Sequence, residues 1–86
     1  MDVVPVVLRI DGFDFLFFSD EGVEPRHIHV RNAGRMAKFW LDPVALAYRG
    51  TYHDREIRQI ERLVSEHQNE LREAWNEFFP RRTSTE

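Results

Sequence analysis

Residues 6–17 decide the first part of the fold, and they read VVLRIDGFDFLF. Apolar and polar side chains alternate on both sides of Asp11-Gly12, a dipeptide that is typical of a two-residue hairpin turn. A turn at this position pairs Ile10 with Phe13 and continues outward with apolar residues facing apolar residues. The stretch therefore predicts a β-hairpin with one apolar face.

A second hairpin follows a polar, acidic loop. From residue 27 to residue 41 the chain alternates again, and the alternation is interrupted by Ala33-Gly34. If these two residues form the turn, Ile28 faces Phe39 in the core. A three-residue loop would change this register, but the two-residue turn keeps the apolar residues together, so we prefer it.

A helix is predicted in the C-terminal half of the chain. Apolar residues recur in steps of three and four from about residue 54 to residue 79, which is the period of an amphipathic helix, and Pro80 ends the pattern. Before the helix, residues 44–48 alternate once more, so they form either a fifth short strand or an irregular connection.

These elements predict a single domain over residues 1–86 in the α+β class. We expect an antiparallel β-meander of four to five strands packed on one long C-terminal amphipathic helix, which leaves the other face of the sheet open. The expected strands lie at about 3–10, 13–18, 27–32, 35–41 and, as the alternative above, 44–48; the helix lies at about 54–79, and a tail at 80–86.

The composition indicates a small protein that depends on packing for its stability. Of its 86 residues, 42% are hydrophobic and none is cysteine, which excludes disulfides and thiolate metal sites. No apolar segment is long enough to span a membrane, and the N-terminus lacks the pattern of a signal peptide. We therefore expect a cytoplasmic protein without membrane contact. The net charge of -3 argues mildly against a general nucleic-acid binder.

His27 and His29 are the main candidate site, because a spacing of two on a strand points both imidazoles to the same face. Imidazole changes charge near neutral pH, so such a pair suits proton transfer, metal ligation or phosphate contact. We take both as candidate catalytic residues. The expected register places them on the open face of the sheet, beside Lys38 and Trp40.

Three functions remain open for this site. In a metal-free RNA nuclease, the histidines would supply the base and the acid, while Arg31 and Lys38 would stabilise the developing charge. In a partner-binding module, which we favour, the exposed Trp40 and the neighbouring cations would dock a protein partner or a second copy. Arg26 is one of these cations.

The third function is metal binding. Two imidazoles and one carboxylate satisfy a zinc or non-haem iron site, and the carboxylate would come from Glu24 or Asp20 in the preceding loop. Glu24 is also the acid best placed to shift the pKa of an imidazole. No motif for an organic cofactor is present, and we expect no cofactor.

Four segments of the chain carry a further indication: FFSDE at 17–21, EPRHIHV at 24–30, AKFWLDPV at 37–44 and AWNEFF at 74–79. Together they resemble the small bacterial proteins of the family called domain of unknown function 4160. The resemblance implies a short protein that is often encoded beside another small protein, in an arrangement like that of toxin-antitoxin pairs.

The family pattern marks four residues of this chain, Glu24, Pro25, His27 and His29, and implies no catalytic role for any of them. The chain departs from the pattern at the start of the helix, where relatives often have a Ser-Pro-like pair. Here it has His53-Asp54, so the cap of the helix is not given by the resemblance.

Overall fold

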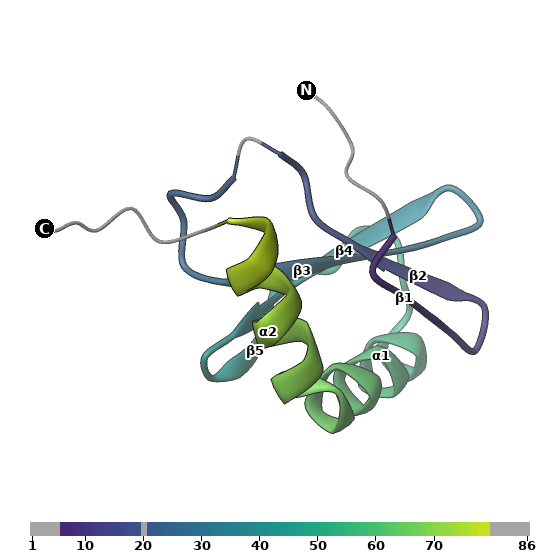
Figure 1. The fold of residues 1–86 in the computed structure, drawn as a ribbon. Helices are drawn as coiled ribbons and strands as arrows, with labels where there is room; N and C mark the ends of the chain where they lie inside the picture. The colour runs from purple at the N-terminus through teal and green to yellow at the C-terminus, as the bar shows by residue number, and fades with distance from the viewer. Residues whose placement is uncertain (1–5, 20, 80–86) are drawn as a thin grey trace, which may run out of the picture.

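The structure is a computed structural model that describes residues 6–19 and 21–79. The strands are β1 (Leu8–Ile10), β2 (Phe13–Leu16), β3 (His27–Asn32), β4 (Arg35–Leu41) and β5 (Val44–Tyr48), and the helices are α1 (Asp54–Glu66) and α2 (Gln68–Phe78). The strands form one antiparallel sheet in sequence order, which Figure 1 shows with both helices beside it. The predicted α+β meander is confirmed, and residues 44–48 are a strand.

Both hairpins have the predicted register. Ile10 lies opposite Phe13 across the first turn, and Ile28 lies opposite Phe39 across the second. The turn residues Ala33 and Gly34 have φ angles of 52° and 80°, the left-handed values that a type I′ turn requires at both central positions. The two-residue turn thus places the apolar side chains of β3 and β4 on one face.

The first two strands are shorter than we expected. β1 begins at Leu8 rather than at about residue 3, and residues 1–5 lie outside the described residues, as does the predicted tail at 80–86. β2 ends at Leu16, although Phe18 still makes an isolated bridge. Beyond Leu16 the chain continues into the connection between β2 and β3. This connection, residues 17–26, is called the β2–β3 loop below.

The predicted single helix is wrong in one respect: it is two helices. His67 separates them with φ and ψ angles of -113° and 21°, and the side-chain amide of Gln68 donates to the carbonyl oxygen of Leu41 at 2.7 Å. A break of one residue leaves the apolar period almost unchanged, so the sequence pattern did not reveal it. No helix in the described residues has the length and apolarity needed to cross a membrane.

The break directs α2 toward the β2–β3 loop, as Figure 1 shows. The core is formed by one face of the sheet and the inner sides of both helices; its most deeply buried side chains include Phe15, Phe17, Ile28, Phe39, Leu41, Ile60 and Leu71. Trp75 of α2 reaches the ring of Phe17 at a centroid distance of 5.4 Å. The end of the sheet near the β2–β3 loop is therefore covered by that loop and by α2.

Candidate metal centre

His27 and His29 are buried, which corrects our expectation that both rings project into solvent from an open sheet face. The exposed fraction of the residue is 0% for His27 and 8% for His29. Their cross-strand partners are the predicted ones, Trp40 and Lys38. The register was thus right, but the alternation of a strand does not tell whether another segment covers the face.

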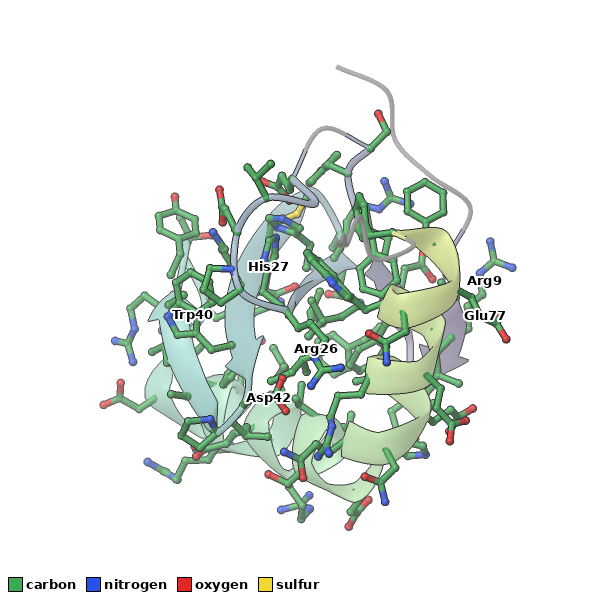
Figure 2. All side chains as sticks on the ribbon, turned by 60° about the vertical axis from the view of Figure 1, so that its left-hand side comes forward. Arg9, Arg26, His27, Trp40, Asp42 and Glu77 are labelled. Atoms are coloured by element: carbon green, nitrogen blue, oxygen red, sulfur yellow. The ribbon has the colours of Figure 1, made fainter. Side chains whose placement is uncertain are left out.

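Aromatic rings and the β2–β3 loop cover the pair. The ring of Trp75 lies 4.9 Å from that of His27, and the ring of Phe18 lies 4.5 Å from that of His29, measured between centroids. Figure 2 shows His27 and Arg26 between the sheet and α2. The two imidazoles are themselves 5.2 Å apart, edge to face, so their Nε2 atoms converge on one point.

Glu21 occupies that point. Its Oε1 atom lies 2.8 Å from Nε2 of His27 and 2.7 Å from Nε2 of His29. A tight turn in the β2–β3 loop positions it, because the backbone N–H of Glu21 donates to the Phe18 carbonyl and its own carbonyl accepts from the N–H of Glu24. Glu21 is the member of this cluster that the sequence interpretation missed.

Glu24, which we expected to be the acid at the imidazoles, has a different partner. Its carboxylate accepts a hydrogen bond from Nζ of Lys38 at 2.8 Å, whereas it stays 3.7 Å from Nδ1 of His27. The latter distance is too long for a hydrogen bond. Asp20, the other expected ligand, lies outside the described residues.

The protonation states at neutral pH follow from burial and contact. Burial raises the pKa of Glu21, but the hydrogen bonds and charges of His27 and His29 outweigh burial and leave that pKa below its ordinary value of 4.5. For His29, burial lowers the pKa below its ordinary value of 6.5, and the neighbouring Glu21 offsets this only in part. Glu21 is therefore ionised, and His29 is neutral.

The hydrogen-bond inventory of His27 then requires a positive charge at the cluster. Nδ1 lies 2.9 Å from the carbonyl oxygen of Pro25, which can only accept, so Nδ1 carries a hydrogen and donates it. In a neutral ring, Nε2 would then be a lone pair facing the ionised carboxylate of Glu21. Two acceptors repel at this distance unless a cation joins them, either a second proton on His27 or a metal ion.

The donor set suits a metal ion. One donor atom from each of Glu21, His27 and His29 lies within 4.8 Å of the other two. Two imidazole nitrogens with one carboxylate oxygen are the ligands of catalytic zinc sites and of non-haem iron sites. Nδ1 of His27 donates to the backbone carbonyl of Pro25, the kind of hydrogen bond that fixes the tautomer of a ligating histidine.

The other predicted binding residues lie outside this cluster. Arg26 donates to Asp42 at 2.8 Å and to Asn76 of α2 at 3.0 Å, so it joins the β4–β5 turn to the helix, as Figure 2 shows. Arg31 donates to Asp14 on β2. Both guanidinium groups are thus engaged with carboxylates and serve the fold.

Lys38 and Trp40, by contrast, lie next to the cluster. Nζ of Lys38 is 4.6 Å from the centre of the Trp40 ring, which is half-buried, and the edge of His27 meets that ring at 5.7 Å. The exposed aromatic that we expected on an open face is therefore partly covered by a lysine. These two residues form the wall of the site on the β4 side.

Comparison with known proteins gives one match. The model of a protein family described as Domain of unknown function (DUF4160) matches residues 12–76 of the 86-residue chain, a span that contains Glu21, both histidines and Trp75. No curated protein and no solved structure matches the chain.

Proposed function

The chain belongs to the DUF4160 family of domains of unknown function, and we propose that it is a metal-binding protein whose ion is held by Glu21, His27 and His29. The ion is a divalent first-row transition metal such as zinc or iron(II), because imidazole nitrogen and carboxylate oxygen suit these ions better than they suit magnesium or calcium.

The hydrogen bond of His27 to Pro25 carries this proposal. It fixes a hydrogen on Nδ1 and turns the Nε2 lone pair toward the carboxylate of Glu21, where only a cation satisfies both groups. The Nε2 atom of His29 points to the same oxygen. A metal ion satisfies all three donors at once after the carboxylate oxygen moves away from both Nε2 atoms by roughly 0.6–0.7 Å, because the ligands of a tetrahedral ion lie about 3.4 Å from one another at bond lengths of about 2.1 Å.

Metal binding by the purified, untagged chain tests the proposal. We expect one zinc ion per chain by metal analysis and by isothermal titration calorimetry, with no comparable binding of magnesium. His29→Asn removes one ligand, because the asparagine amide does not reach the position of the His29 Nε2 atom, and keeps a polar side chain. It should weaken zinc binding by more than about 100-fold, since even the loss of a residue that hydrogen-bonds to a ligand costs about 10–100-fold.

The matched control is His53→Asn, which removes a histidine at the exposed start of α1, far along the chain from the cluster. We expect unchanged zinc affinity in this variant, and circular dichroism should show that both variants are folded. A wild-type chain that binds far less than one zinc ion would refute the proposal. Equal losses in the two variants would also refute it.

The burial of His27 weighs against the metal-free nuclease. General acid-base cleavage requires two groups that both reach the substrate, within hydrogen-bond distance or through one water molecule. His27 has no exposed surface, and Arg31 is paired with Asp14. His29 alone retains access, so the pair does not supply both an acid and a base to an external phosphodiester.

Partner binding in a bacterial, cytoplasmic module of the toxin-antitoxin type is the second candidate. β5 favours it, because this strand lies at an edge of the described sheet, contains no charged residue and leaves Leu46 41% exposed. An uncharged, exposed edge strand is a template for pairing with another chain. The absence of cysteine from the 86 residues is consistent with a reducing compartment.

Light scattering of the chain, alone and with the product of the neighbouring reading frame, tests the second candidate. We expect a complex of defined stoichiometry that Leu46→Lys disrupts. Val23→Lys is the control, because Val23 is also apolar and 88% exposed but lies in the β2–β3 loop. A monomer under both conditions would exclude this function.

A further inference from the structure

A row of three residues crosses the sheet on the side of the metal centre. His29 on β3 lies opposite Lys38 on β4, and Lys38 lies opposite Tyr48 on β5, next to a shift of register in the β4–β5 pairing. Cross-strand partners point to the same face of a sheet. Because neighbouring strands lie about 4.8 Å apart, the row spans about 10 Å from His29 to Tyr48.

The row begins at the accessible side of the metal centre. The side chain of His27 is 0% exposed, whereas those of His29 and Glu21 are 11% and 18% exposed. An external ligand of the ion must therefore arrive beside His29 and Glu21. A set of three protein ligands leaves at least one position of a zinc or iron ion for such a ligand.

Lys38 is the cation nearest to this entrance. It lies directly opposite His29 across β3 and β4, so its ammonium group is beside the metal centre. Its Nζ atom donates to Glu24 at 2.8 Å, so an anion reaches Lys38 by displacing a carboxylate whose side chain is 39% exposed. Arg26 and Arg31 are likewise paired with carboxylates, and Lys38 is the one of these three cations that lies directly opposite His29.

Tyr48 ends the row with an aromatic surface. It is 61% exposed, the largest exposed fraction of any aromatic residue among the described large hydrophobic side chains. Exposed aromatic rings beside a cation are the platform on which proteins stack nucleic-acid bases. A phosphate at Lys38 and a ring at Tyr48 match the two ends of one nucleotide.

We infer that the row His29–Lys38–Tyr48 binds a nucleotide, with its phosphate between the metal ion and Lys38 and its base on Tyr48. This inference rests on the proposed metal function, because the ion supplies the second contact to the phosphate. The same chemistry is present in a free nucleotide and in single-stranded RNA.

Calorimetric titration of the zinc-loaded, full-length chain tests the inference. The probes are adenosine 5′-monophosphate, inorganic phosphate, adenosine and a single-stranded RNA tetranucleotide. We expect the monophosphate to bind roughly tenfold more tightly than phosphate, which corresponds to the stacking of one base on an aromatic ring. A further gain for the tetranucleotide identifies RNA as the ligand, and equal affinity identifies the free nucleotide.

Substitutions at Tyr48 and at Lys38 separate the contact to the base from the contact to the phosphate. Tyr48→Ala should reduce the affinity for the monophosphate to that for phosphate, whereas Tyr48→Phe should retain it. Lys38→Met should weaken both probes, and Arg49→Met should weaken neither, because Arg49 is an exposed cation that pairs with Asp54. Arg49→Met is thus the control for general attraction of anions.

The outcomes distinguish this inference from the function on which it rests. One zinc ion per chain without any preference for the monophosphate over phosphate overturns the nucleotide site alone. Unchanged affinity of Tyr48→Ala for the monophosphate also overturns the nucleotide site alone. A chain that holds no zinc overturns both the metal centre and the nucleotide site.

Discussion

Replacing Glu21 by glutamine tests the central contact of the site without changing its shape. In the metal-free chain, the carboxylate accepts hydrogen bonds from Nε2 of His27 at 2.8 Å and from Nε2 of His29 at 2.7 Å when both nitrogens carry a hydrogen. A hydrogen bond to a charged group contributes about 1.5–3 kcal/mol net, and a neutral one about 0.5–1.5 kcal/mol. The loss of the charge at two bonds should therefore lower the free energy of unfolding by about 2 kcal/mol.

The measurement is urea denaturation at pH 7 in the presence of a chelator, followed by circular dichroism. In thermal denaturation of a domain of this size, the same loss of about 2 kcal/mol corresponds to a decrease of roughly 8–16 °C in Tm. Glu77→Gln is the matched control, because Glu77 lies on the outer side of α2, as Figure 2 shows, and is exposed. We expect Glu77→Gln to stay within about 0.5 kcal/mol of wild type.

The pH dependence gives a second test of the same variant. The pKa of Glu21 is lowered in the folded state, so its contribution to stability is present above the unfolded value of 4.5 and is lost as the pH falls through the folded value. The difference between wild type and Glu21→Gln should therefore shrink below pH 4.5. A Glu21→Gln protein as stable as Glu77→Gln at pH 7, or a difference that grows in acid, would refute the reasoning.

Three further predictions concern the surroundings of the site and the fold. Gly50→Ala should lower the free energy of unfolding by at least about 2 kcal/mol in urea, because φ is 60° and the new Cβ would collide with the carbonyl oxygen of Met36; wild-type stability would contradict this. Trp75→Ala should cost about 3–5 kcal/mol, since the buried ring packs on His27, and a smaller loss than 1 kcal/mol would show that α2 is not part of the core. The pKa of His29 lies below 6.5 in the folded state, so the unfolded chain binds this proton first as the pH falls. The free energy of unfolding should therefore begin to fall below pH 6.5. Urea titrations that give the same free energy of unfolding from pH 6.5 to about pH 5 would disprove this.

The sheet could be predicted from the sequence because its information is local. Asp11 and Gly12 have φ angles of 55° and 84°, the geometry that this dipeptide favours, and the turn then fixes every pairing of β1 with β2. At Ala33 the residue type is less favourable for a positive φ. The register was still predictable there, because only one choice keeps Ile28 and Phe39 on the same face.

The break between α1 and α2 could not be predicted in the same way. His67 lies in the apolar stripe, and its Nδ1 donates to the carbonyl oxygen of Leu63, so it continues the contacts of α1 even where the helix ends. Leu71 and Trp75 keep the spacing of the stripe and remain buried. The contact that accompanies the change of direction joins Gln68 to Leu41, which are 27 residues apart, and no local pattern encodes it.

The acid of the candidate metal centre was beyond prediction for a related reason. Three acids, Asp20, Glu21 and Glu24, precede the histidines within a few residues, and periodicity has no meaning in a loop. Glu21 reaches the imidazoles because the turn from Phe18 folds the loop back over β3, and Glu24 is drawn away by Lys38. The loop that buries the histidines is therefore the loop that supplies their carboxylate. Since both depend on the same turn, a substitution that opens the loop should expose the imidazoles and remove the carboxylate of Glu21 from them in a single event.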